Sequence, residues 1–104
     1  MCDFAYTVAA TFSNEGVAEE WVRWLREGHV AEVVAAGATD GEIIEIDGPD
    51  RLVEVRYHFP TRQAFAVYER EHAPRLRAEG LKRFGAERGI AYRRSAGDVI
   101  ARFA

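Results

Sequence analysis

Three histidines are the side chains of this sequence best suited to acid–base or metal chemistry, and two of them share a motif. The segments WVRWLREGHVAEVVAAG (residues 21–37) and YEREHAPRLRAEG (residues 68–80) each place an apolar residue four positions after a histidine and a glycine four positions later. An imidazole can serve as a general base, and several convergent imidazoles can hold zinc. His29 and His72 are therefore candidate catalytic residues, with His58 as a third.

The elements that carry these histidines decide which of them can converge. His29 and His72 fall on or beside the apolar stripes of two predicted helices, whereas His58 falls on the polar face of a predicted strand. We expect them on opposite sides of one sheet, which argues against a metal site. For the helical pair the sequence favours a structural role, in which each imidazole bonds a carbonyl freed by an irregularity at Gly28 or Pro74. A functional role for the pair is the alternative.

Two groups of side chains are candidates for binding a small molecule. Aromatic walls with an arginine or histidine to orient the ligand would suit a small, flat or acidic compound. The first group would line a cleft between helices and sheet, and the second a cavity between two subunits. The first group is His29, His72, Tyr57, Tyr68 and Arg62; the second is Glu54, Arg56, His58 and Arg93. We expect Trp21 and Trp24 to be core or interface residues instead.

Hydrophobic periodicity predicts two strand–helix–strand units. Residues 3–12 and 51–59 alternate as half-buried strands do, and residues 39–47 lie before the turn DGPD. The first helix is predicted over residues 14–36, bent at Gly28 and ended by Gly37. The second helix begins after Thr61 and is interrupted at Pro74. Residues 89–95 form another predicted strand, and residues 99–103 a short fifth one.

This order predicts an α+β fold of the ferredoxin-like type, a split βαβ sandwich over a single domain of residues 1–104. In this βαββαβ arrangement a four-stranded antiparallel sheet carries both helices on one face. Right-handed crossovers give the strand order 4-1-3-2. The uncovered face would be small and semi-polar, and we expect it to be solvated or to meet the same face of a second chain. The residues assigned to it are Ala5, Thr7, Ala9, Thr11, Glu54, Arg56 and His58, with Tyr92 as its one candidate aromatic.

Three longer motifs carry a resemblance to a known family. They are W-x-x-W-L-R-E-x-H-V-x-E-V (residues 21–33), Y-x-F-x-x-R-x-A-F-x-x-Y (residues 57–68) and E-H-A-P-R-L-R-A-E-G-L-K-R-F (residues 71–84). With them the chain resembles a small bacterial family known only as a domain of unknown function. That family lies in the dimeric α/β-barrel superfamily, which also contains the antibiotic-biosynthesis monooxygenases. The resemblance implies a ferredoxin-like fold and a homodimer, and it implies no activity.

Composition narrows the remaining classes of function. The net charge of −3 and the absence of a stacking-aromatic and glycine motif argue against a nucleic-acid partner. We expect no membrane segment and no cofactor, because no long apolar run and no glycine-rich phosphate loop is present. The single cysteine, Cys2, is expected to be inert, and the chain to be cytoplasmic.

Two functions from different classes fit these observations. The first is a non-catalytic homodimer that binds a small ligand or another protein. The second is a cofactor-independent enzyme, similar to a monooxygenase or an isomerase, that acts on a small organic substrate with a histidine base. If His58 lies in an enclosed cavity near Glu54 or Arg93, the enzyme is favoured. If the open sheet face packs tightly against the same face of a second chain, the non-catalytic homodimer is favoured.

Overall fold

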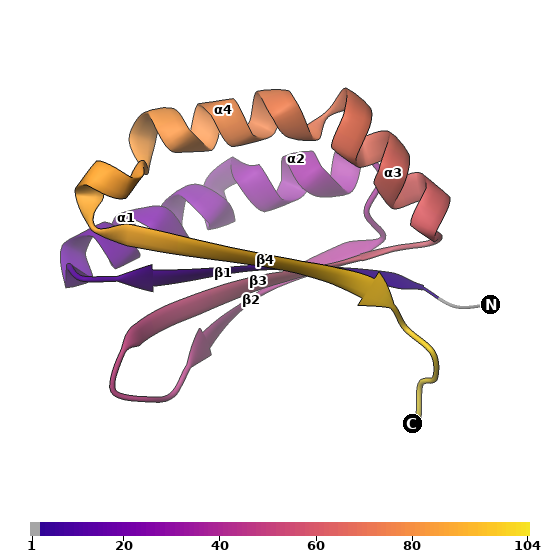
Figure 1. Cartoon of the computed structure of the whole chain (residues 1–104), viewed down its shortest axis with the longest axis horizontal. Coiled ribbons are helices and arrows are strands. Elements are labelled where there is room, and N and C mark those ends of the chain that lie inside the picture. Colours follow the sequence, from indigo (N-terminus) through magenta and orange to yellow (C-terminus); the bar gives the residue numbers. More distant parts are fainter. Residues whose placement is uncertain (1–2) are drawn as a thin grey trace.

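The computed structural model of the chain describes residues 3–104, so Cys2 lies outside it. One sheet of four antiparallel strands has the order β2-β3-β1-β4, which confirms the predicted topology. All the helices lie on one face of this sheet (Figure 1). The elements are β1 (Phe4–Phe12), α1 (Glu15–Trp24), η1 (Leu25–His29), α2 (Val30–Ala35), β2 (Asp40–Ile46), β3 (Arg51–Phe59), α3 (Arg62–Glu71), α4 (Ala73–Arg83), η2 (Ala86–Arg88) and β4 (Ile90–Asp98).

The central strands β1 and β3 divide their side chains between two faces, because successive residues of a strand point to opposite sides. Tyr6 lies opposite Tyr57, and both are buried under the helices. On the other face Ala9 lies opposite Glu54, and neither is fully buried. The predicted assignment of these two strands to faces is therefore confirmed.

The first helical arm contains a π-helical turn where a bend is predicted. The Asn14 side chain caps α1 by accepting a hydrogen bond of 3.1 Å from the Val17 amide. Residues Leu25–His29 then form the π turn η1, in which the Val30 amide bonds the Leu25 carbonyl. Gly37 follows α2 with a φ of 132°, a conformation that favours glycine. The arm thus stays helical from Glu15 to Ala35, with the irregular turn at η1.

The second helical arm is broken in two at the predicted place. Thr61 caps α3, and its hydroxyl accepts a bond of 3.0 Å from the Ala64 amide. His72 separates α3 from α4 with a non-helical backbone, and Pro74 lies in the first turn of α4, where its missing N–H costs nothing. The two halves differ at their last motif position. Gly37 ends a helix, whereas Gly80 lies inside α4, where a Cβ would stand 3.1 Å from the Trp24 ring.

The end of the chain departs from the sequence prediction. β4 runs to Asp98, three residues further than expected, because it pairs with β1 along the whole length of that strand. Residues 99–104 form no strand, so the predicted fifth strand is absent from this chain taken alone. The Val99 amide bonds the Asp3 carbonyl at 2.8 Å, and the tail then leaves the sheet on the side away from the helices (Figure 1).

Candidate functional site: an aromatic cavity under the helices

A cavity of about 60 Å³ lies between the helices and the sheet. Its walls come from β1, β3 and β4 on one side and from α1, η1, α3 and α4 on the other. Aromatic and aliphatic side chains predominate, with one histidine and two arginines. The lining residues are Tyr6, Val8, Trp21, Trp24, Leu25, His29, Val55, Tyr57, Tyr68, Leu76, Arg77, Gly80, Leu81, Tyr92 and Arg94.

Stacked rings build the two ends of this cavity. At one end Trp24 stacks on His29 with ring centroids 4.1 Å apart and planes inclined by 21°. At the other end Tyr6 stacks on Tyr57 at 5.9 Å, and the Tyr68 ring is tilted against that of Tyr6 at 6.4 Å. Such pairs hold flat walls rigidly, because offset aromatic contacts add to the free energy of burial. The cavity therefore offers flat apolar surfaces to a flat ligand.

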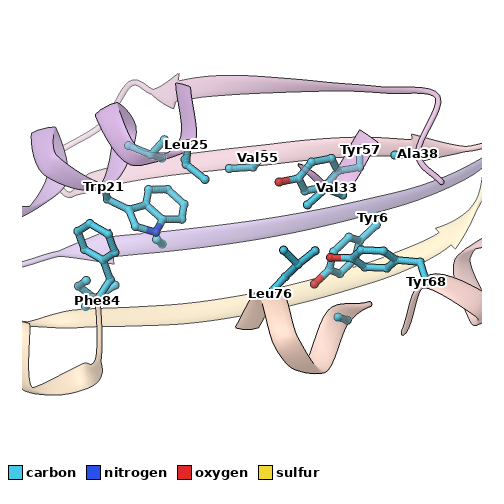
Figure 2. Close-up of a cluster of buried hydrophobic side chains, with 14 of the residues drawn as sticks. Tyr6, Trp21, Leu25, Val33, Ala38, Val55, Tyr57, Tyr68, Leu76 and Phe84 are labelled. Carbon is cyan, nitrogen blue, oxygen red and sulfur yellow. The ribbon is translucent and has the colours of Figure 1, made fainter. Parts of the chain in front are cut away.

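Two tyrosine hydroxyls are free to bond a ligand. Figure 2 shows the hydroxyl oxygens of Tyr6, Tyr57 and Tyr68 directed to the same side, toward the end that holds Trp21. Within residues 3–104 the hydroxyls of Tyr57 and Tyr68 have no hydrogen-bond partner. Burial raises the pKa of Tyr57, and it raises the pKa of Tyr68 to about 12. Both phenols stay protonated at neutral pH, so each can donate a hydrogen bond.

Arg77 joins α4 to the tyrosine wall. Its Nη2 donates to a carboxylate oxygen of Glu69 and, at 3.3 Å, to the Tyr6 hydroxyl. Burial alone would lower the pKa of Arg77, but these partners raise it overall, so the guanidinium stays charged. Its Nε is buried and has no partner among residues 3–104. Arg77 thus orients Tyr6 and keeps a positive charge at the cavity wall.

His29 enters the cavity because of the π turn that ends on it. Its Nδ1 is buried and has no hydrogen-bond partner among the described residues, so the predicted bond from this atom to a freed carbonyl is not formed. Burial lowers the pKa of the imidazole, opposed by the weaker attraction of Glu32 and Glu79. The ring is therefore mainly neutral at pH 7. A neutral imidazole can accept a proton or a hydrogen bond from a ligand.

The first predicted group is only partly assembled. His29, Tyr57 and Tyr68 line the cavity together, but His72 and Arg62 do not. His72 is held at the junction of α3 and α4, because Pro74 forces the helix to restart there. Arg62 lies exposed in the first turn of α3, where it pairs with Asp98 at 2.8 Å and covers the Phe4 ring.

The second predicted group lies on the open face of the sheet but forms no common site. Arg56 bonds Glu54 at 2.7 Å, while the Nδ1 of His58 lies 2.9 Å from an Asp40 carboxylate oxygen. His58 thus pairs with a residue of β2 and not with Glu54 or Arg93. Arg93 is exposed on β4 and forms no ion pair among residues 3–104. The charges on this face are mostly paired, which suits an interface better than a catalytic site.

The sequence prediction missed several residues that line the cavity. Trp21 and Trp24 were expected only in the core or at an interface, yet both line the cavity as well. Tyr92 was considered for the open face, but it lies opposite Ala10 on the helix side and donates a bond of 2.7 Å to the Phe84 carbonyl. The alternation of β4 from the buried Ile90 carried this signal, because Tyr92 and Arg94 share the parity of Ile90.

In residues 3–104, no group of three or more histidine, cysteine, aspartate or glutamate side chains is placed to hold a metal ion. None of the helices in that part of the chain has the length and apolar character needed to cross a bilayer.

The chain belongs to the family described as a domain of unknown function, DUF4286, which it matches over residues 4–95. This confirms the resemblance seen in the sequence. Among curated proteins, none matches the chain.

Solved structures with the same fold include proteins described as dimers and as an oxygenase. A dimeric ferredoxin-like protein from an uncultured marine organism is 17% identical with a TM-score of 0.73, over 99% of this chain and 100% of that chain. A protein from Shewanella oneidensis is 16% identical with a TM-score of 0.68, over 93% and 91%. A variant of SnoaB, a cofactor-independent oxygenase from Streptomyces nogalater, is 12% identical with a TM-score of 0.66, over 98% and 95%. At such identities the likeness shows a ferredoxin-like fold and nothing more.

Proposed function

We propose that this protein is a non-catalytic, cytoplasmic homodimer that binds a small organic ligand in the cavity between its helices and its sheet. One observation carries the proposal: the cavity joins stacked aromatic walls to polar groups that the protein leaves unbonded, namely the Tyr57 and Tyr68 hydroxyls. Neither hydroxyl is fully buried, whereas the Nδ1 of His29 is, and a fully buried polar atom without a partner costs about 1–3 kcal/mol. A ligand that bonds this atom would recover that free energy, which favours binding over a purely structural role.

The homodimer is supported by the open face of the sheet and by the tail. Half-buried Ile44, Ile46 and Leu52 lie close together at one end of this face. Ile100 and Phe103 in the tail are 88% and 95% exposed, which is costly in a chain that stays alone. A twin subunit packed on the open face, in the manner of a dimeric α/β barrel, would cover both, and proteins of this fold include ones described as dimeric.

Ligand binding can be tested with a library of small aromatic compounds followed by amide chemical shifts. We expect binders to shift amides of cavity residues on β1, β4 and α4. Val8→Phe should abolish these shifts, because its ring would occupy the cavity floor. Val22→Phe is the matched control, since it adds the same ring on α1 outside the cavity. Binders that shift only residues outside the cavity, or that bind Val8→Phe equally, would contradict the proposal.

A second candidate function is a cofactor-independent enzyme with His29 as general base. The observation that favours it is a mainly neutral imidazole inside an aromatic cavity, in a fold shared with a cofactor-independent oxygenase. Binders from the library should be incubated with the protein in air and analysed by mass spectrometry. Ligand recovered unchanged supports the binding protein. A product that forms with the wild type and not with His29→Gln would support the enzyme.

A further inference from the structure

Arg94 is a cation at the cavity that has no acidic partner in residues 3–104. It lies on β4 opposite Val8, and its guanidinium carbon stands 5.7 Å from the centroid of the Tyr92 ring. The other arginine of the cavity, Arg77, already forms an ion pair with Glu69. Arg94 is exposed, whereas the aromatic walls beneath it are buried or half-buried. Its charge therefore stands at the boundary between solvent and an apolar cavity.

The rest of the lining is complementary to a negative ligand. No carboxylate of residues 3–104 lines the cavity, although the chain as a whole has a net charge of −3. The lining also includes Tyr57 and Tyr68, whose hydroxyls can donate hydrogen bonds. Arg94 and Tyr68 line the same cavity, and the charge of Arg94 lowers the pKa of Tyr68 against the larger effect of burial. Both groups therefore face a ligand bound in the cavity.

We propose that the cavity takes a small aromatic carboxylate, with its ring among the aromatic side chains and its carboxylate on Arg94 and the Tyr68 hydroxyl. This inference rests on the proposed ligand-binding function and names the class of ligand. A carboxylate matches the site because a guanidinium presents two parallel N–H donors to its two oxygens. One unpaired cation also balances one negative charge, whereas a phosphate dianion would need a second one.

The size of the cavity limits how far a ring can enter. A volume of about 60 Å³ is below the roughly 150 Å³ of an apolar cavity that holds benzene, so only part of the ring enters and the charged group stays at the mouth, beside Arg94 and the half-exposed Leu81. The carboxylate then stays partly hydrated and need not be buried, which avoids the large cost of desolvating a charge. Affinity for a compound of this size is expected to be modest.

The test compares benzoate with benzamide, a neutral molecule of the same shape. Trp21 and Trp24 are the only tryptophans of the chain and both line the cavity, so intrinsic fluorescence reports binding directly. We expect benzoate to bind at least tenfold more tightly than benzamide. Arg94→Gln should weaken benzoate binding tenfold to a hundredfold, roughly the range for a charge-assisted hydrogen bond, and leave benzamide binding unchanged. The benzoate affinity of Arg94→Lys should lie between those of the wild type and Arg94→Gln, because lysine keeps the positive charge but lacks the two parallel N–H donors of a guanidinium.

Arg93→Gln is the matched control, because Arg93 is the next residue on β4 and points to the opposite face of the sheet. It removes the same charge and should leave benzoate binding within twofold of the wild type. Equal affinities for benzoate and benzamide, or benzoate binding that Arg94→Gln does not weaken, would overturn the carboxylate proposal while the ligand-binding function stands. Phenyl phosphate binding more tightly than benzoate would overturn it in favour of another anion. If benzoate does not bind, the carboxylate proposal fails, and the library experiment with Val8→Phe separately decides the ligand-binding function.

Discussion

The two faces of one sheet are built by the same strands and yet differ in almost every physical property. On the helix side, aromatic rings enclose a cavity, and two buried polar atoms of its lining, His29 Nδ1 and Arg77 Nε, have no partner in residues 3–104. On the open side, small residues alternate with charged ones, and the charges are mostly paired, as Arg56 with Glu54 and His58 with Asp40. Unbonded polar groups in an apolar setting indicate a ligand site, whereas paired charges on a flat surface indicate an interface.

The largest expected effect is on the free energy of unfolding. Two adjacent residues of β3, one on each face of the sheet, should differ strongly in how much their substitution lowers it. Tyr57→Ala should destabilise the fold by about 3–5 kcal/mol, since it removes a buried ring from the core. His58→Ala should cost below about 1 kcal/mol, because its pairing with Asp40 is exposed. Urea denaturation measures both values. Equal losses would mean that the open face is as tightly packed as the core.

Association tests the open face with a smaller free-energy change. Ala9→Arg places a long charged side chain at the middle of that face, where the twofold axis of a dimer would bring two copies together. Like charges there should weaken the dimer on the order of 100-fold, measured by light scattering across a dilution series. Ala35→Arg, on the exposed surface of α2, is the control and should change nothing. A wild type that is monomeric at high concentration would contradict the assignment of this face.

The pH dependence of stability should reveal the half-buried imidazole of His29 in the cavity. Burial lowers the pKa of His29 below 6.5, its ordinary value, so the unfolded chain binds more protons than the folded one between the two values. Stability should therefore fall as the pH drops below about 6.5 toward the lowered pKa. In His29→Phe this part of the loss should disappear, which thermal unfolding at a series of pH values can follow. A parallel pH dependence in both proteins would show that His29 is not the group that titrates.

The smallest effect concerns a hydroxyl that the fold does not use. Tyr68→Phe should change the free energy of unfolding at neutral pH by less than about 0.5 kcal/mol, because this hydroxyl has no partner among the described residues. Tyr6→Phe should cost about 1 kcal/mol, since it removes the bond from Arg77. The two variants differ only in which ring loses its oxygen. A larger loss for Tyr68→Phe would show that its hydroxyl serves the fold and is not reserved for a ligand.

Sequence periodicity was sufficient for the fold because β1 and β3 alternate clearly between apolar and polar positions and the helices carry apolar stripes, although the phase of β2 was ambiguous. The strand β3 was placed at its observed bounds, and Pro74 marked the break between α3 and α4. The fifth strand failed because a strand needs a neighbour to pair with, and residues 99–104 meet none in the single chain. Local pattern cannot supply a partner that lies outside the chain.

The site was harder to predict because it depends on how helices are rotated about their axes. His29 lies at the end of a π turn, which the spacing of apolar residues did not predict. His72 lies at the junction where a new helix begins at Pro74, and its side chain does not line the cavity. Two histidines in matching motifs therefore have different surroundings. Arg94 could have been found by extending the alternation of β4, but its lack of an acidic partner is visible only in three dimensions.

The π turn also gives this segment freedom to change in length. It holds one residue more than an α-helical turn, so removing one residue from Leu25–His29 would restore regular hydrogen bonding with little rotation of α2. Val33, which is fully buried, would then stay in the core. Substitution is also tolerated: nothing lies within 4 Å of where a Gly28 Cβ would stand, so an alanine fits there. Homologous segments should thus vary in side chain at that point, and some should be one residue shorter.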